Sequence, residues 1–315
     1  MIRFLRRRLG QALIVLFLVS LIVFVLLQLL PGGVAHAVLG PRATAAQIAT
    51  FNHDNGLDKP IFEQYFIWLW HLLHGDLGYS YHLNQTVSSL IAQKLPKTIV
   101  LNLLALVIAV IVAIPIGVAQ AVRRNSFFDY SATGVGFVFY SMPTFYLSLL
   151  LVLWLSLDLR VFPAEAPQSQ SVLGILSQPM GLVLPVMSLV LLSVSLFTRY
   201  MRSSVMDNLV QDYVRTARSK GASERRVLYR HVLRNSLIPM ATILGLSLPG
   251  ILAGSLVTEQ VFNYPGMGLL FWQEAQVNDY PTLLGITLVT GVATVVGNLL
   301  ADIAYAVLDP RVRYS

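Results

Sequence analysis

The chain has 315 residues, of which 56% are hydrophobic and only 12% are charged. That charged share is about half of what soluble domains carry, so a large soluble core is excluded and a polytopic membrane protein is predicted. The absence of cysteine excludes disulfides and thiol chemistry. The net charge of +7 would suggest nucleic acid in a soluble protein. Here the basic residues flank apolar segments, so membrane topology is the preferred explanation and no nucleic-acid partner is expected.

The chain opens with a basic segment followed by an apolar run. Arg3, Arg6, Arg7 and Arg8 precede the apolar run Leu9–Leu30. A secretory signal peptide begins in the same way, but its apolar region is shorter and ends at a small-residue cleavage site, which is missing here. Residues 1–30 are therefore interpreted as a basic segment and a retained first membrane helix.

A helix that crosses a bilayer needs about 20 mostly apolar residues. Six charge-free segments meet this requirement, and they predict an all-α integral membrane protein: Leu9–Leu30, Thr98–Val122, Tyr130–Leu157, Met180–Thr198, Asn235–Thr258 and Tyr280–Ala301, the last continuing to Val307. A further run, Tyr65–Leu73, is too short to span and is rich in aromatic residues. We expect it to form a helix at the outer interface.

The distribution of positive charge predicts the orientation. Of the 22 lysines and arginines, 17 fall on the side that would hold both termini and 5 fall on the other. Cytoplasmic loops carry the excess of these residues, so both termini are expected inside. The segment 31–97, with a short helix beginning near Thr44, becomes an extracytoplasmic insertion, and residues 98–315 form the transmembrane core.

The predicted spans offer little that could drive transport. Asp302 is the one ionisable candidate, and we interpret it as a carboxylate near the cytoplasmic interface, paired with an N-terminal arginine or hydrogen-bonded to Asn298. A proton relay is the alternative. No phosphate-binding Gly-x4-Gly-Lys-Ser/Thr loop is present. His71 and His74 make at most a weak metal site. No catalytic, cofactor-binding or metal site is therefore expected in this chain, which fits a subunit driven by a separate ATPase.

The one long basic segment lies between the fourth and fifth predicted spans, at 199–234. Two short helices are expected there, separated by Gly221, which permits the positive φ of a sharp helix exit. Val214 and Ala217 would form an apolar face that packs on a partner, while arginines reach acidic groups. The candidate docking residues are Asp212, Tyr213, Arg215, Thr216, Ala217, Arg218, Lys220, Gly221, Arg225 and Arg226. A basic loop that touches only lipid headgroups is the alternative.

The run from Asp212 to Gly221 closely resembles the coupling loop, or EAA loop, of the dipeptide, oligopeptide and nickel permeases, which are membrane subunits of binding-protein-dependent ABC importers. Arg215 and Thr216 stand where the broader importer consensus has Glu-Ala, as in the peptide subfamily. The runs 56–60 and 75–78 extend the resemblance to nearly the whole chain.

A second motif of the same family follows the fifth predicted span. Val261 to Gly268 resembles its Phe-x-Tyr-Pro-Gly-Met/Leu-Gly signature, which implies a loop near the outer gate or the docked binding protein. A stiff interfacial turn is the alternative. The candidate residues are Glu259, Phe262, Tyr264, Pro265, Gly266 and Gly268. In the third span, Pro143 resembles the proline of the family's Ser-x-Pro-x-Phe and is expected to kink the helix.

The resemblance implies a type I importer permease in a prokaryotic inner membrane. Its expected partners are a homologous second permease, two ATPase subunits that bind ATP and magnesium, and an extracytoplasmic substrate-binding protein. The expected cargo is di- or oligopeptides, with nickel, glutathione or another small solute as alternatives. A stand-alone secondary transporter or channel is the rival function. A membrane-embedded structural or assembly protein with no transport path is a further rival.

Overall fold

The computed structural model describes residues 2–30, 32–40 and 43–308. The order of its elements is α1 (Ile2–Gln28), α2 (Gly33–Leu39), α3 (Ala45–Asp54), α4 (Ile61–Leu73), β1 (Tyr79–Ser80), β2 (Gln85–Thr86), α5 (Val87–Val122), α6 (Phe127–Ser141), α7 (Thr144–Leu151), the π-helix η1 (Val152–Asp158), α8 (Val172–Leu176), α9 (Pro179–Leu209), α10 (Asp212–Ser219), α11 (Glu224–Arg226), the π-helix η2 (Val227–Val232), α12 (Leu233–Ala253), α13 (Leu256–Val261), α14 (Met267–Val277) and α15 (Tyr280–Leu308).

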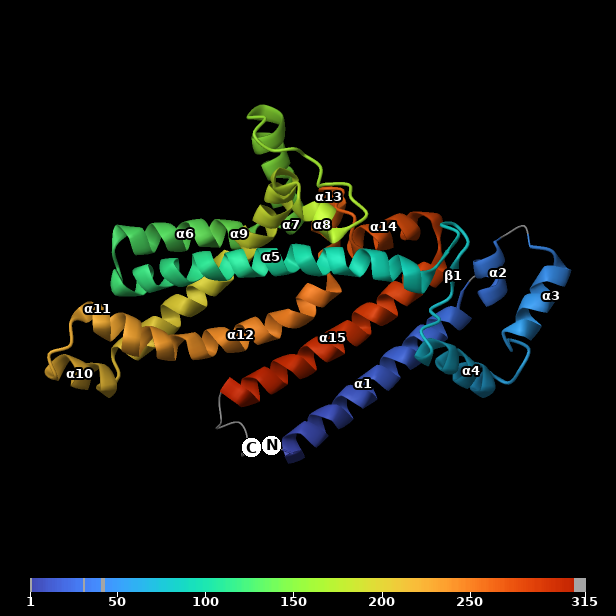
Figure 1. Cartoon of the computed structure of the whole chain (residues 1–315), viewed down its shortest axis with the longest axis horizontal. Helices are drawn as coiled ribbons and strands as arrows, with labels where there is room; N and C mark the ends of the chain where they lie inside the picture. Colours follow the sequence, from blue (N-terminus) through green and yellow to red (C-terminus); the bar gives the residue numbers. More distant parts are fainter. Residues whose placement is uncertain (1, 31, 41–42, 309–315) are drawn as a thin grey trace.

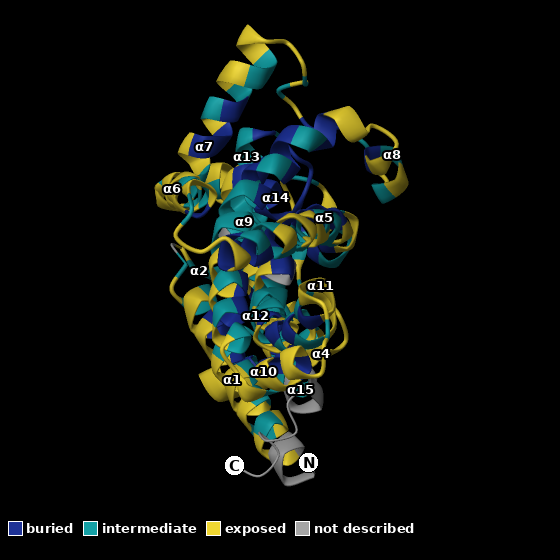
Figure 2. Cartoon of the chain, turned by 90° about the vertical axis from the view of Figure 1, so that its left-hand side faces the viewer, coloured by how far each residue is buried: buried dark blue, intermediate teal, exposed yellow. Residues whose placement is uncertain are grey.

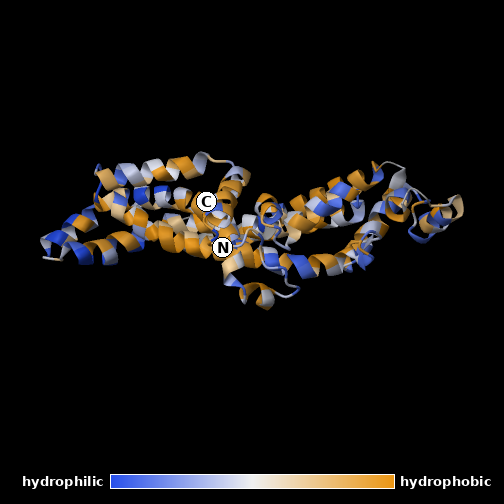
Figure 3. Ribbon diagram, turned by 90° about the horizontal axis from the view of Figure 1, so that it is seen from above, coloured by the Kyte–Doolittle hydropathy of each residue, from blue (hydrophilic) through white to orange (hydrophobic). Residues whose placement is uncertain are grey.

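The long helices α1, α5, α9, α12 and α15 run roughly along the length of an elongated molecule (Figure 1). One end carries α10 and α11 and is called the loop end below. The other carries α2, α3, α4 and the β1–β2 hairpin and is called the insertion end. Hydrophobic residues predominate in the central helices, and hydrophilic residues gather at the loop end (Figure 3).

The predicted all-α membrane architecture is confirmed. Within the described residues, five helices are long and apolar enough to cross a membrane, and a bent pair, α6 with α7 and η1, raises the number to six. Helices α1, α5, α9 and α15 are longer than the predicted spans. Helix α9, for example, continues to Leu209, where the prediction ended at Thr198. Hydropathy marks only the apolar length of a helix, so the prediction ended where the basic residues of α9 begin, although the helix continues. The predicted fifth span, 235–258, is too long at its end, because α12 stops at Ala253 before Gly254 with φ +88° and Thr258 lies in α13.

The predicted third span, 130–157, is not one continuous helix. α6 ends at Ser141, Pro143 is the N-cap residue of α7, and the two helical segments diverge by 106°. Proline lacks the N–H that would continue the ladder, and its ring clashes with the preceding turn, so a break here is expected. The proline therefore does more than kink the helix, and α7 leaves α6 steeply (Figure 2).

Small residues bring α5 and α9 together. Ala105, Ala109, Ala113 and Gly117 recur every four residues along α5, and the three alanines belong to the largest buried cluster. A Cβ atom at Gly117 would lie 2.7 Å from the Cβ atom of Met201 and 2.9 Å from the Thr198 carbonyl oxygen. Such spacing allows close backbone approach in membrane helices. The α5–α9 pair is thus the packed centre of the fold.

The insertion end contains the elements that the sequence predicted there. Thr44 caps α3 in a capping box with Gln47, as the predicted helix start near Thr44 requires. The aromatic run 65–73 lies in α4. The hydroxyl groups of Tyr65 in α4 and Ser20 in α1 are hydrogen-bonded at 2.8 Å, so the insertion is tied to the first span.

The predicted pairing of Asp302 with an N-terminal arginine is confirmed. Nη1 of Arg8 in α1 lies 3.1 Å from Oδ2 of Asp302 in α15. Both side chains are partly exposed, which fits a pair near the end of a span.

Candidate functional sites

The short helices of the loop end are anchored on this chain itself. Val214 and Ala217 of α10 are buried, as is Val227 of η2. They share one apolar cluster with Val118 and Ala121 of α5, Met201 and Val205 of α9, and Val232 of η2. The prediction that this apolar face packs on a partner is therefore wrong. The apolar face is buried within the chain, because α5 and α9 extend far enough to pack against it.

The turn after α10 has the backbone geometry that the sequence predicted. Gly221 has φ +79°. Its N–H donates to the Arg218 carbonyl, and the Ala222 N–H donates to the Ala217 carbonyl, which is the Schellman pattern. The second short helix is not separate, however, because α11 and η2 continue directly into α12. The π-helical turn of η2 keeps the helical ladder intact where a loop was expected.

The face of the loop end that remains accessible is strongly basic. The side chains of Lys220, Arg225, Arg226 and Arg230 are exposed, and that of Arg215 is 75% exposed although it lies 3.8 Å from Asp212. Arg218 differs from these residues because its guanidinium group donates two hydrogen bonds to Glu224, at 2.8 and 3.0 Å.

Other predicted docking residues stabilise the loop from within. The Tyr213 hydroxyl donates to Asn208 Oδ1 at 2.7 Å, and the Thr216 hydroxyl donates to the Asp212 carbonyl. Arg218 and Tyr213 therefore hold the loop, while the exposed basic residues are left for a contact outside this chain.

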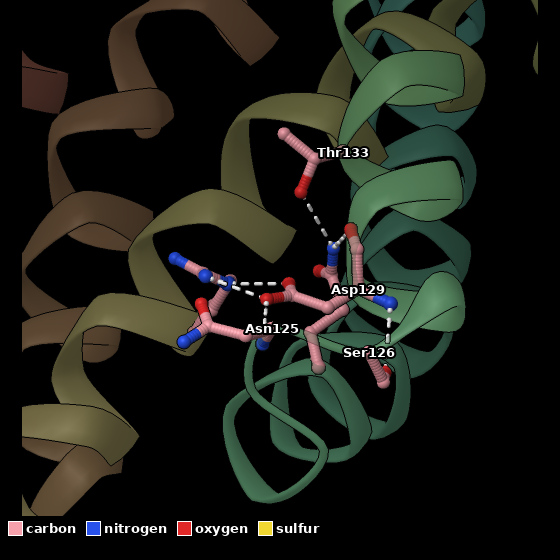
Figure 4. A network of polar contacts seen from close by, with 6 residues as sticks. Asn125, Ser126, Asp129 and Thr133 are labelled. Atoms are coloured by element: carbon pink, nitrogen blue, oxygen red, sulfur yellow. Dashed lines mark hydrogen bonds and ion pairs between the residues drawn. The ribbon is translucent and has the colours of Figure 1, made fainter.

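A partly buried ion pair joins the loop-end half of α9 to α6. Arg202 of α9 donates to both carboxylate oxygens of Asp129, at 2.7 and 2.8 Å, and Asp129 is 1% exposed. Asp129 also accepts from the Asn125 N–H, and its own N–H donates to the Ser126 hydroxyl (Figure 4).

The same network reaches α5. The side-chain amide of Gln120 donates to the Asp129 carbonyl and to the Thr133 hydroxyl. Through these contacts and the apolar cluster, the loop end, α5, α6 and α9 form one connected unit.

The second predicted site is organised around a carboxylate. Glu259 of α13 is fully buried. One of its oxygens accepts from the Thr98 hydroxyl at 2.8 Å, and the other accepts from the N–H groups of Gly268 and Leu269 at 2.6 and 3.2 Å. The carboxylate thus occupies the N-terminus of α14, where free N–H groups and the helix dipole favour negative charge. Burial raises the pKa of Glu259, and these hydrogen bonds oppose that rise.

The neighbouring signature residues fit around Glu259. The Tyr264 hydroxyl donates to the Lys97 carbonyl at 2.7 Å, and burial raises the pKa of this phenol. A Cβ atom at Gly266 would lie within about 2.5 Å of Glu259 and Thr98 oxygens, and one at Gly268 would lie 2.4 Å from the Leu256 Cα atom. Both glycines are therefore required by close approach.

All six predicted residues of this site, Glu259, Phe262, Tyr264, Pro265, Gly266 and Gly268, are buried in the chain. The geometry favours the interpretation as a stiff turn, because these side chains offer no surface to a docked protein. The turn fastens α14 to the start of the apolar part of α5.

Helix α14 is held a second time, by the β1–β2 hairpin. His82 Nδ1 lies 3.0 Å from the carboxylate of Glu274, a residue that is 1% exposed. Burial raises the pKa of Glu274, while the contact with His82 lowers it. Ser80 donates to Asp279, which also accepts from the Thr282 hydroxyl. The insertion is thereby joined to both α14 and α15.

Several of these residues were missed from the sequence. Asp129 stands just before the predicted third span and three residues after Ser126, a spacing typical of a helix start, which was the available signal. Nothing in the sequence indicates that Arg202 is its partner. No group of three potential metal ligands occurs among the described residues.

Comparison with known proteins gives a consistent family assignment. Residues 113–314 match the model of the family described as "Binding-protein-dependent transport system inner membrane component", and residues 1–102 match that of its N-terminal part. The chain belongs to this family.

Similar proteins align over almost the entire length of this family member. The oligopeptide transport system permease protein AppB of Bacillus subtilis is 38% identical, covering 98% of both chains. A putative peptide permease of Brucella suis is 38% identical over 100% of both. The dipeptide permease DppB of Lactococcus lactis is 35% identical over 99% of this chain and 100% of its own. The resemblance inferred from the motifs is confirmed, and the chain is a multi-pass membrane permease subunit.

Proposed function

We propose that this chain is one permease subunit of an ATP-driven peptide importer. The observation that carries the substrate class is the full-length similarity to proteins named as oligopeptide and dipeptide permeases. In this proposal the loop end is cytoplasmic, the insertion end faces outside, and a homologous permease completes the transport path. A substrate-binding protein delivers the peptide, and two ATPase subunits bind ATP and magnesium.

The geometry of the loop end supports the coupling role. Its apolar face is fixed on α5 and α9, and its exposed face is basic. An ATPase surface that contacts the basic face would act on a lever that is already joined to the membrane helices. The Arg202–Asp129 pair extends this lever to α6. Closure of the ATPase pair on ATP would then be passed to three spans together, and hydrolysis would reset them.

Reconstitution of the complete importer in proteoliposomes tests the proposal. Labelled di- and oligopeptides should accumulate only with ATP, the ATPases and the binding protein, and the isolated permease should hydrolyse no ATP. Uptake by the isolated permease without ATP would instead establish a secondary transporter or channel. ATP-dependent uptake of nickel or glutathione with no uptake of peptides would retain the importer and replace its cargo.

A further inference from the structure

A cavity at the insertion end lies away from the connected unit formed by the loop end, α5, α6 and α9. Its volume is about 540 Å³, which is within the range of small-molecule sites. It is partly open and is lined by residues of α1, α2, α3, α4, α15 and the β1–β2 hairpin. Segments from both ends of the chain therefore build one chamber.

The deeper part of the cavity is apolar. Val23 and Phe24 of α1 and Leu288 of α15 line it, and each is at most 5% exposed. Trp68 of α4 also lines the cavity, and its ring packs against Phe24 with the ring centroids 5.7 Å apart. An apolar side chain placed here would be removed from water at a gain of about 25 cal/mol per Å² of buried area.

The cavity also has a polar part. Gln28, in the last turn of α1, donates to Gln64 Oε1 at 2.8 Å, and Gln64 in turn donates to the carbonyls of Leu57 and Lys59. The hydrogen-bonding atoms of Gln64 are thus all used. Within the described residues, Oε1 of Gln28 accepts no hydrogen bond, so it can receive an N–H group from a ligand.

The charge of the lining distinguishes between ligands. Asp76 is the one carboxylate in the lining, and its side chain is 60% exposed. His71 Nδ1 lies 3.6 Å from it. No lysine or arginine is among the described residues that line the cavity. A phosphate group would have no fixed positive charge to bind and would meet a carboxylate, whereas an ammonium group would be attracted.

We propose that this cavity binds the amino-terminal residue of a transported peptide. The apolar side chain lies in the deep part, the ammonium group lies beside Asp76, and a peptide N–H donates to Gln28. The inference rests on the proposed peptide transport. It adds a preference among peptides, which the loop end and its contacts with α5, α6 and α9 do not provide. The permease itself then favours peptides that begin with a large apolar residue.

Trp68 provides a direct measurement of binding. The chain has four tryptophans, so replacing Trp70, Trp154 and Trp272 with phenylalanine leaves Trp68 as the single reporter. Tripeptides that begin with leucine or with serine are titrated against the purified full-length chain. The leucine probe should change Trp68 fluorescence and bind about tenfold more tightly than the serine probe, because one large apolar side chain is buried.

The role of Asp76 is tested by a double-perturbation cycle, in which Asp76→Asn is combined with acetylation of the peptide's amino group and the affinities are compared. Asp76→Asn removes the charge and keeps an oxygen that can accept from the Gly78 N–H, as Asp76 does now at 3.0 Å. Acetylating the amino group of the leucine probe should weaken binding about threefold in the chain with Asp76, as expected for a partly exposed ion pair. It should have no effect in the Asp76→Asn variant. Asp54→Asn, on α3 and outside the lining, is the matched control and should behave like the unaltered chain.

Equal affinity for the leucine and serine probes, or equal loss on acetylation in both variants, would overturn the proposal. Quenching of Trp68 by a brominated phospholipid that the leucine probe does not displace would also overturn it, since the occupant would then be lipid. Uptake by the complete importer is measured in parallel. If no peptide is taken up, the proposed function fails; if peptides are taken up without any preference, only the cavity assignment fails.

Discussion

Replacement of Glu259 tests whether the buried carboxylate holds α14 in place. In Glu259→Ala, three donors lose their acceptor: the Thr98 hydroxyl and the N–H groups of Gly268 and Leu269. Each buried donor left unpaired costs about 1–3 kcal/mol. Part of the total for the three donors is offset, because the variant no longer buries a carboxylate, which itself costs free energy. We therefore expect a loss of about 3 kcal/mol in the free energy of unfolding.

Glu259→Gln should cost much less. Its amide oxygen can accept from Gly268 and Leu269, and its NH₂ group can donate to the Thr98 oxygen, so only the Thr98 hydroxyl must find another acceptor. The expected loss is about 1 kcal/mol. The free energies are measured by denaturant titration of the purified chain in mixed micelles. Glu63→Ala and Glu63→Gln, at an exposed site on α4, are the controls and should both change stability by less than about 0.5 kcal/mol. Equal stability of the two Glu259 variants would refute the capping argument.

Three further predictions concern coupling and topology. Gly221→Val should reduce ATPase association and uptake, because a β-branched residue reaches the left-handed conformation at a cost of about 1–2 kcal/mol; Gly221→Asn should retain most activity, and equal behaviour of the two would disprove the backbone requirement. Asp129→Asn should lower peptide uptake per ATP hydrolysed in the complete importer, and exchanging Asp129 and Arg202 should restore part of that ratio; an unchanged ratio would show that the pair transmits nothing. Reporters at Asn125 and at the C-terminus should be cytoplasmic and one at Asn52 extracytoplasmic, and any other pattern would contradict the proposed orientation.

The predictions that succeeded depended on local sequence. Hydropathy located the spans because each residue that faces the lipid must itself be apolar. Gly221 was identified because a sharp helix exit needs a positive φ. Pro143 predicted a kink for the same kind of reason, and the structure has a break there. The size of that break depends on which neighbours receive α7, so it could not be read from the proline.

The predictions that failed depended on packing between distant segments. The apolar face of Val214 and Ala217 was recognised correctly, but sequence spacing does not reveal whether such a face meets a partner or the same chain. For the signature residues around Glu259, the sequence likewise left open whether they form a loop near the outer gate or a stiff turn. The acceptor role of Glu259 depends on Thr98, which lies 161 positions earlier.

The position of α1 has a consequence for biosynthesis. Chains fold as they are made, beginning at the N-terminus, yet the helix against which α1 chiefly packs is α15, which is made after the other described helices. The Asp302 carboxylate that pairs with Arg8 arrives equally late. The first span must therefore wait in the bilayer until α15 has been made, and a chain truncated before α15 lacks the surface that would receive α1. The packing of α1 in its final position therefore reports that synthesis has passed α15.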